Sequence, residues 1–134
     1  MHTEKSSIRG LIVTHGDLGK ELMASARLVV VTESSLSILS NRDRGKREMQ
    51  QLISEWLQSA EGPAVIMVDE GLGSCGTAAC VAASGRKDTW VLSGVNLSMV
   101  VTYLSRVGRL SPSELVEKVT RRAREAVRIM ELEP

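Results

Sequence analysis

The chain has 134 residues, enough for one domain, and its core must be aliphatic because 43% of residues are hydrophobic but only 2% aromatic. Its 17 basic and 16 acidic residues nearly cancel. No basic stripe with interleaved aromatic residues appears, which argues against a nucleic-acid ligand. Since no apolar run reaches the roughly 18 residues of a membrane span, we expect no direct membrane insertion.

The first predicted elements form a strand and a helix. Residues 1–7 are polar and predict a loose tail, in which His2 has no expected role. Residues 8–14 form a nearly continuous apolar run, typical of a strand buried on both faces of a parallel sheet. A helix is expected at 17–31, with Asp17 as a plausible N-cap.

The rest of the chain alternates between short apolar runs and helical patterns. Ser111, Pro112 and Glu114 together form a strong helix-start signal, since a serine can cap and proline suits the first helical position. Residues 127–132 fit either the end of that helix or a short strand. In chain order we expect strands at 36–39, 64–68 and 89–93, helices at 44–60, 77–84, 97–107 and from 111 onward, and a glycine-rich loop at 70–76.

This alternation predicts a single α/β domain over residues 1–134, a doubly wound sheet with helices on both faces. Ligands of such sheets bind beyond the carboxyl ends of the strands, where the strand order reverses. His15 follows the first strand and Asp69 follows the third. If the strand order begins 2-1-3, these two side chains meet in one crevice.

A histidine beside a carboxylate is an activated pair, because the carboxylate fixes the tautomer and leaves the second ring nitrogen free as a nucleophile. The loop from Gly71 to Gly76 leads into a helix N-terminus, where free amides favour an anion and Ser74 is the expected cap. Together these features suggest a phosphoryl group carried on His15. The loop is neither a P-loop nor a dinucleotide fingerprint.

We therefore assign His15 and Asp69 as candidate catalytic residues, and expect no metal and no cofactor. The plainer interpretations are that His15 is a hydrogen-bonded strand end, that Asp69 caps a loop and that the glycines only form turns. The residues assigned to phosphate binding flank the histidine or lie in the glycine-rich loop: Thr14, Gly16, Gly73 and Ser74.

The two cysteines, Cys75 and Cys80, have neither a disulfide framework nor zinc-finger spacing, which fits a reducing cytoplasm. Cys75 lies near a predicted helix N-terminus, where a thiol pKa tends to fall, so a redox role is one interpretation. The spacing is poor for a Cys-x-x-Cys mechanism. We prefer packing among small residues.

Three segments, in this order and at this spacing, carry a resemblance to a known family. They are residues 10–16 (GLIVTHG), residues 67–69 (MVD) followed by Gly73-Ser74 and Ala78-Ala79, and residues 93–99 (SGVNLSM). With them, the sequence resembles the IIA domain of the mannose-family sugar phosphotransferase system over about residues 8–130.

The resemblance implies a flavodoxin-like three-layer sandwich with sheet order 2-1-3-4-5. It implies that the residue matching His15 accepts phosphate from phospho-HPr and passes it to a IIB protein, with Asp69 as the orienting carboxylate and Ser74 as a hydroxyl near the phosphate. It also implies a homodimer that exchanges an antiparallel fifth strand, which here falls on residues 127–132.

The sequence departs from the family pattern at Glu70-Gly71, Leu72, Cys75 and Ser98. Glu70 adds a negative charge next to a site that must hold phosphate. The departures leave two alternatives to a sugar-transport phosphocarrier: a regulatory or binding module of the same fold, and a phosphocarrier for dihydroxyacetone kinase. The chain ends at Pro134 without a linker to a IIB domain, so we expect a free-standing component.

Overall fold

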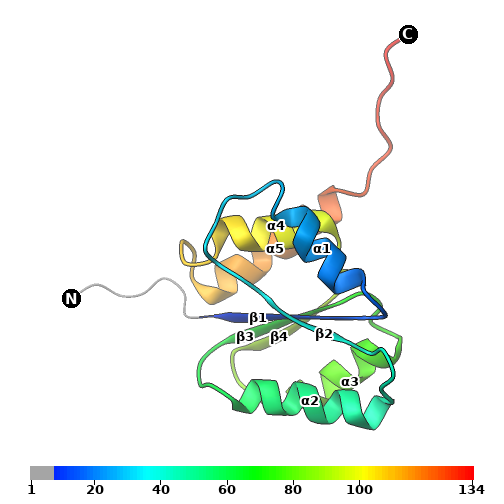
Figure 1. Ribbon diagram of the computed structural model, residues 1–134. Helices are drawn as coiled ribbons and strands as arrows, with labels where there is room; N and C mark the ends of the chain where they lie inside the picture. Colours follow the sequence, from blue (N-terminus) through cyan, green and yellow to red (C-terminus); the bar gives the residue numbers. More distant parts are fainter. Residues whose placement is uncertain (1–7) are drawn as a thin grey trace, which may run out of the picture.

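The computed structural model describes residues 8–134, so the expected tail at 1–7, with His2, lies outside the described residues. A parallel sheet forms the middle layer, α1, α4 and α5 cover one face, and α2 and α3 cover the other (Figure 1). In chain order the elements are β1 (Arg9–Thr14), α1 (Leu18–Ala26), β2 (Ser37–Ser40), α2 (Lys46–Gln58), β3 (Ala64–Val68), α3 (Ser74–Ala83), β4 (Thr89–Ser93), α4 (Leu97–Arg106) and α5 (Pro112–Glu125).

Across the described residues the sheet has four strands in the order β2-β1-β3-β4, and every neighbouring pair is parallel. The chain moves to one side from β1 to β2 and then crosses to the other side for β3, so the order reverses between β1 and β3. Thr14 is paired with Ser40, and Val13 with Val68. The carboxyl ends of β1 and β3 therefore lie side by side, as the α/β prediction requires.

The two central strands are buried because both of their faces are covered by helices. Alternate residues enter different cores: Ile12 and Met67 pack in the core under α1, α4 and α5, while Val13 and Ile66 pack in the core over α2 and α3. A strand points successive side chains to opposite faces, so a continuous apolar run serves both cores. This packing fixes the position of the strand ends relative to the helices.

Two predicted helix boundaries are wrong. The first helix ends at Ala26, not near residue 31. Three consecutive β-branched residues follow it, of which Val29 and Val31 are exposed and Val30 is partly buried against the core. Stiff β-branched side chains lower helix propensity, and the two exposed ones gain no packing that would offset this. The α3 helix begins at Ser74, not at Thr77.

Three capping predictions have different outcomes. Gly73 is the N-cap of α3, so Ser74 is the first helical residue and not the cap. Asp17 stands at the N-cap position of α1, but its side chain makes no capping hydrogen bond. The signal at Ser111 is confirmed, since Ser111 and Glu114 form a reciprocal capping box with Pro112 in the first turn.

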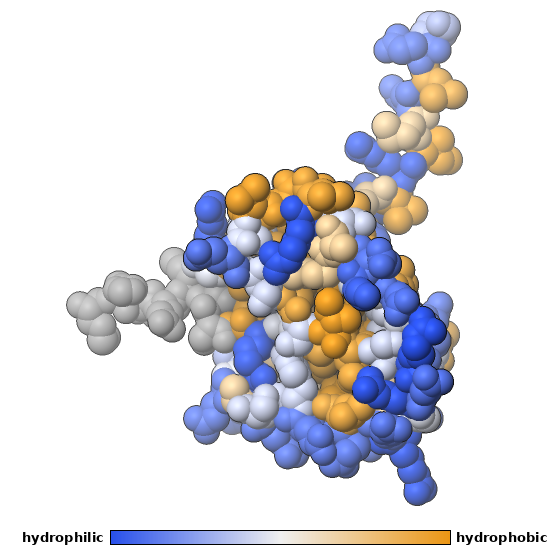
Figure 2. Space-filling model, in the orientation of Figure 1, coloured by the Kyte–Doolittle hydropathy of each residue, from blue (hydrophilic) through white to orange (hydrophobic). Residues whose placement is uncertain are grey.

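The chain beyond α5 is neither helix nor strand, and it leads away from the body of the molecule (Figure 1). Its apolar side chains are interspersed with polar ones and lie exposed (Figure 2), with Ile129 98% and Leu132 88% exposed. The observed sheet thus contains the first four strands of the expected order, and a fifth strand stays a prediction.

No helix within residues 8–134 is both long and apolar enough to cross a membrane.

Tyr103 on α4 predicts a loss of stability at alkaline pH. Its side chain is 1% exposed, and burial raises the pKa of Tyr103 to about 12. The ordinary pKa of tyrosine is about 10, so the stabilising contribution is complete below pH 10 and is lost as pH rises towards 12. Between pH 8 and pH 11 we expect the natural protein to lose about 1.4 kcal/mol more unfolding free energy than Tyr103→Phe. Urea unfolding at both pH values measures this difference, and equal losses would contradict it.

Candidate active site

His15 lies at the tip of β1, where the chain turns sharply. Gly16 has a φ of +54°, a conformation that glycine adopts without strain. Thr14 is fully buried, and its hydroxyl accepts a hydrogen bond of 2.8 Å from the amide of Gly19. This bond ties the end of β1 to α1. Thr14 therefore lies beneath the histidine and not on the surface of the site.

The loop after β2 clamps this turn from the side. The amide of Asn41 donates to the carbonyl of Thr14 at 3.1 Å, and the side-chain oxygen of Asn41 accepts from the amide of Gly16 at 3.1 Å. Arg42 reaches Asp17, with 3.2 Å between Nη2 and Oδ1, and brings its guanidinium beside Gly16. Neither Asn41 nor Arg42 was predicted as a site residue, because a polar turn after a strand does not by itself indicate a functional role.

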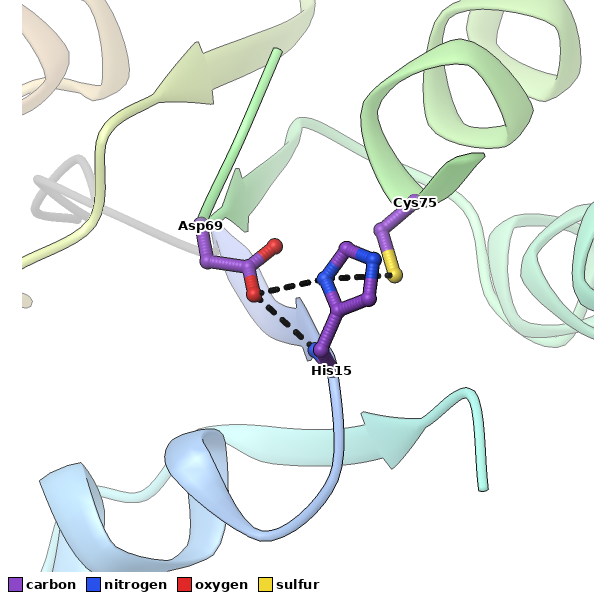
Figure 3. Close-up of side chains that lie close together, drawn as sticks. All are labelled: His15, Asp69 and Cys75. Atoms are coloured by element: carbon purple, nitrogen blue, oxygen red, sulfur yellow. Dashed lines mark hydrogen bonds and ion pairs between the residues drawn. The ribbon is translucent and has the colours of Figure 1, made fainter. Parts of the chain in front are cut away.

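The Asp69 carboxylate follows β3 and holds the imidazole in one orientation (Figure 3). Its Oδ2 lies 2.9 Å from Nδ1 of His15 and accepts a second bond of 3.0 Å from the His15 amide. Its Oδ1 accepts a bond of 2.9 Å from the Glu70 amide. With its proton on Nδ1, the ring donates to Asp69, and Nε2 carries the free lone pair.

The two side chains differ in exposure. His15 is 50% exposed, whereas Asp69 is 12% exposed. Burial acts to raise the pKa of Asp69, but the hydrogen bonds from the His15 amide and ring, the charge interaction with His15 and the Glu70 amide together lower it. Asp69 is therefore a fixed carboxylate at neutral pH, and the ring that it orients is open to solvent.

The glycine-rich loop brings the N-terminus of α3 to the same edge. The first helical hydrogen bond of α3 runs from the Thr77 amide to the Gly73 carbonyl, so the amides of residues 74–76 have no acceptor within the helix. The Gly73 amide donates to the carbonyl of Glu70 and is occupied. The Glu70 side chain turns back on its own loop, with 3.5 Å between its Oε1 and the Leu72 amide.

Cys75 lies beside His15, although it was not among the predicted site residues. Its side chain is fully buried, and Sγ lies 4.0 Å from Nδ1 of His15 (Figure 3). Burial raises the pKa of the Cys75 thiol, and the charge of Asp69 raises it further despite a hydrogen bond involving Ser74. The fall in thiol pKa expected near a helix N-terminus is wrong, so the thiol stays protonated and a redox role loses its basis.

Solved structures share this fold. The mannose/sorbose-specific IIA subunit of the phosphotransferase system from Enterococcus faecalis is 21% identical, with a TM-score of 0.82 over 96% of this chain and 98% of that one. The phosphotransferase component EIIA from Streptococcus agalactiae is 20% identical, with a TM-score of 0.80 over 91% and 96%. A sigma-54 interaction domain protein from Enterococcus faecalis is 11% identical, with a TM-score of 0.74 over 91% and 94%.

At such low identities these structures establish the fold alone. Among curated proteins no relative matches the sequence. The family model described as "PTS system fructose IIA component" matches residues 10–120, a stretch that contains His15, Asp69 and the whole of α3. Because that match covers most of the chain, the protein belongs to the mannose/fructose-type IIA family of the sugar phosphotransferase system.

Proposed function

We propose that the chain is a phosphocarrier, which takes a phosphoryl group from phospho-HPr onto His15 and passes it to a IIB protein. One observation carries the proposal: a half-exposed imidazole is held through Nδ1 by a partly buried carboxylate, at the reversal point of a parallel sheet. Membership of the IIA family supports the same function. HPr and IIB proteins act in the cytoplasm, and we propose that location for this chain.

In the proposed reaction, the Nε2 lone pair of His15 attacks the phosphorus atom of phospho-HPr. The bond between phosphorus and the donor nitrogen breaks as the bond to Nε2 forms, and the released electron pair returns to HPr. His15 keeps its proton on Nδ1, and Asp69 stabilises the positive charge that the ring gains. Transfer to the IIB protein repeats these steps with His15 as the leaving group. Positioning and charge do most of the work in such transfers.

We propose that the phosphoryl oxygens are bound by groups around Nε2. The amides of residues 74–76, which have no acceptor within the helix, and the Ser74 hydroxyl would bind the phosphoryl oxygens at the start of α3. Gly16 and Gly73 would contribute by allowing a close approach, and Thr14 by fixing the strand end through its buried hydroxyl. Arg42 is the cation beside the Gly16 turn, and its pairing with Asp17 is exposed enough to exchange for a phosphoryl oxygen.

We also propose a homodimer in which residues 127–132 pair with β4 of a second copy. Within residues 8–134, β4 is an edge strand of the sheet, so one row of its backbone groups has no partner strand in that part of the chain. A groove of about 430 Å³ runs beside it, lined in part by Val91, Leu92 and Val127. Burial of the exposed apolar tail in that groove would favour association. Light scattering that finds only monomers would contradict the dimer.

The function is tested by incubating the pure chain with phosphoenolpyruvate, enzyme I and HPr, followed by mass analysis of its fragments. We expect one phosphoryl group, on His15, that disappears when a IIB protein is added. A folded chain that takes up no phosphate would favour the regulatory module, and phosphate on another residue would refute the assignment. Transfer to a kinase subunit charged with ADP, instead of a IIB protein, would identify the dihydroxyacetone kinase carrier.

A further inference from the structure

Three side chains with different donor atoms converge at the site. His15 comes from the end of β1, Asp69 from the end of β3 and Cys75 from the first turn of α3 (Figure 3). One ligand atom from each lies within 4.8 Å of the other two, and the imidazole stands between the carboxylate and the sulfur. The ligands lie far apart in the sequence, so the spacing of the cysteines gave no sign of them.

These separations are close to those of a tetrahedral zinc site. With zinc bonds of about 2.0 Å to nitrogen and oxygen and about 2.3 Å to sulfur, neighbouring ligand atoms are about 3.3–3.6 Å apart. The separation between Nδ1 and Oδ2 is 2.9 Å, and that between Sγ and Nδ1 is 4.0 Å. These two separations differ from the required values by about 0.4 Å. The sulfur and the carboxylate lie within 4.8 Å of each other, so the Cys75 and Asp69 side chains must rotate toward the metal to close the third side of the site. Three protein ligands leave the fourth position to water.

We propose that His15, Asp69 and Cys75 form a zinc site that switches the phosphocarrier off. A nitrogen, a carboxylate and a thiolate suit zinc, which accepts all three ligand types. The half-exposed His15 ring gives the metal a path from solvent, since Cys75 is itself buried. One thiolate and one carboxylate neutralise the charge of Zn²⁺, so the partly buried site carries no net charge when occupied.

Proton movements on zinc binding explain why the metal would inhibit phosphate uptake by His15. This part of the proposal rests on the proposed phosphocarrier function. Zinc bonds to Nδ1 of the neutral ring, whose proton moves to Nε2, and the Cys75 thiol releases its proton to water. Nε2 then holds a proton where its lone pair was, and Asp69 is engaged by the metal. The nitrogen that attacks phosphorus is therefore blocked. In the metal-free protein, Nδ1 donates to Asp69 and Nε2 is free.

The direct test is metal binding by the full chain. Titration calorimetry measures zinc binding, and absorbance spectroscopy measures cobalt bound in place of zinc. We expect one metal per chain and a thiolate-to-cobalt absorption band. Cys75→Ser and His15→Ala should each bind zinc at least about tenfold more weakly, and Cys75→Ser should lose the band. Cys80→Ser is the matched control, because Cys80 is exposed on the same helix and should leave both unchanged.

Equal zinc affinity in Cys75→Ser and Cys80→Ser would overturn the site, provided that urea unfolding shows both variants folded. Cys75→Ala serves as a second variant if serine disturbs this buried position. Inhibition by zinc is measured in a separate experiment, which compares phosphate uptake from phospho-HPr in the presence of added zinc and in the presence of a chelator. Uptake that zinc leaves unchanged would overturn the switch. If phosphate uptake fails even with the chelator, the proposed function fails while the metal measurement stands.

Discussion

Replacing Asp69 by asparagine is expected to slow phosphorylation of His15 by about 10²- to 10⁴-fold. Oδ2 of Asp69 accepts from both the ring and the amide of His15, and Oδ1 accepts from the Glu70 amide. Asparagine has one acceptor and one donor in place of two acceptors. It therefore either loses the Glu70 bond or faces Nδ1 with an NH₂ group, which favours the tautomer with its proton on the attacking Nε2. It also removes the charge that stabilises the imidazolium.

The rate of phosphate uptake from phospho-HPr measures this effect, with Asp17→Asn as the matched control. Asp17 is also a carboxylate close to His15 in sequence, but it is exposed and makes only a surface ion pair with Arg42. Such pairs are worth at most about 1 kcal/mol, so the control should change the rate by less than about fivefold. Equal rates for the two variants would mean that Asp69 does not orient the nucleophile.

The pair at the centre of the site was predictable from the sequence because it depends on strand ends. Two apolar runs stop at a polar residue, and a parallel sheet brings their carboxyl ends to one edge. The observed contact between His15 and Asp69 confirms that spatial prediction. The four-strand order β2-β1-β3-β4 follows from the same alternation of apolar runs and amphipathic helices.

The other parts of the site depend on contacts between loops that are far apart in the sequence, and no local sequence pattern encodes such contacts. Asn41 reaches the His15 turn across 25 or more residues of sequence, and Cys75 reaches the ring across 60. Residues 70–76 looked like one glycine-rich loop, because glycine lowers helix propensity. The helix nevertheless begins at Ser74. Gly76 lies inside it because the backbone of the preceding loop comes too close to leave room for a Cβ atom at this position.

Gly76→Ala tests that cause, and we expect it to lower the free energy of unfolding by at least about 2 kcal/mol. An added Cβ would overlap the carbonyl oxygen of Gly71 and come within 2.6 Å of that of Glu70. Both contacts are with backbone, so no rotamer change relieves them, and the loop that follows Asp69 must move. Phosphate uptake should slow as well, because the Glu70 amide that holds Asp69 belongs to this loop.

Helix propensity alone predicts that Gly76→Ala raises the free energy of unfolding, since alanine is favoured over glycine by about 1 kcal/mol inside a helix. The direction of the change in urea unfolding therefore decides between propensity and close approach. Gly45→Ala is the control, because a Cβ there meets nothing within 4 Å, although Gly45 is the N-cap of α2. Gly45→Ala should lower the free energy of unfolding by no more than about 1 kcal/mol and leave phosphate uptake unchanged. A Gly76→Ala protein as stable as the natural chain would show that α3 and the loop after Asp69 can separate to make room for the added Cβ, and close approach would then not be the reason for glycine at this position.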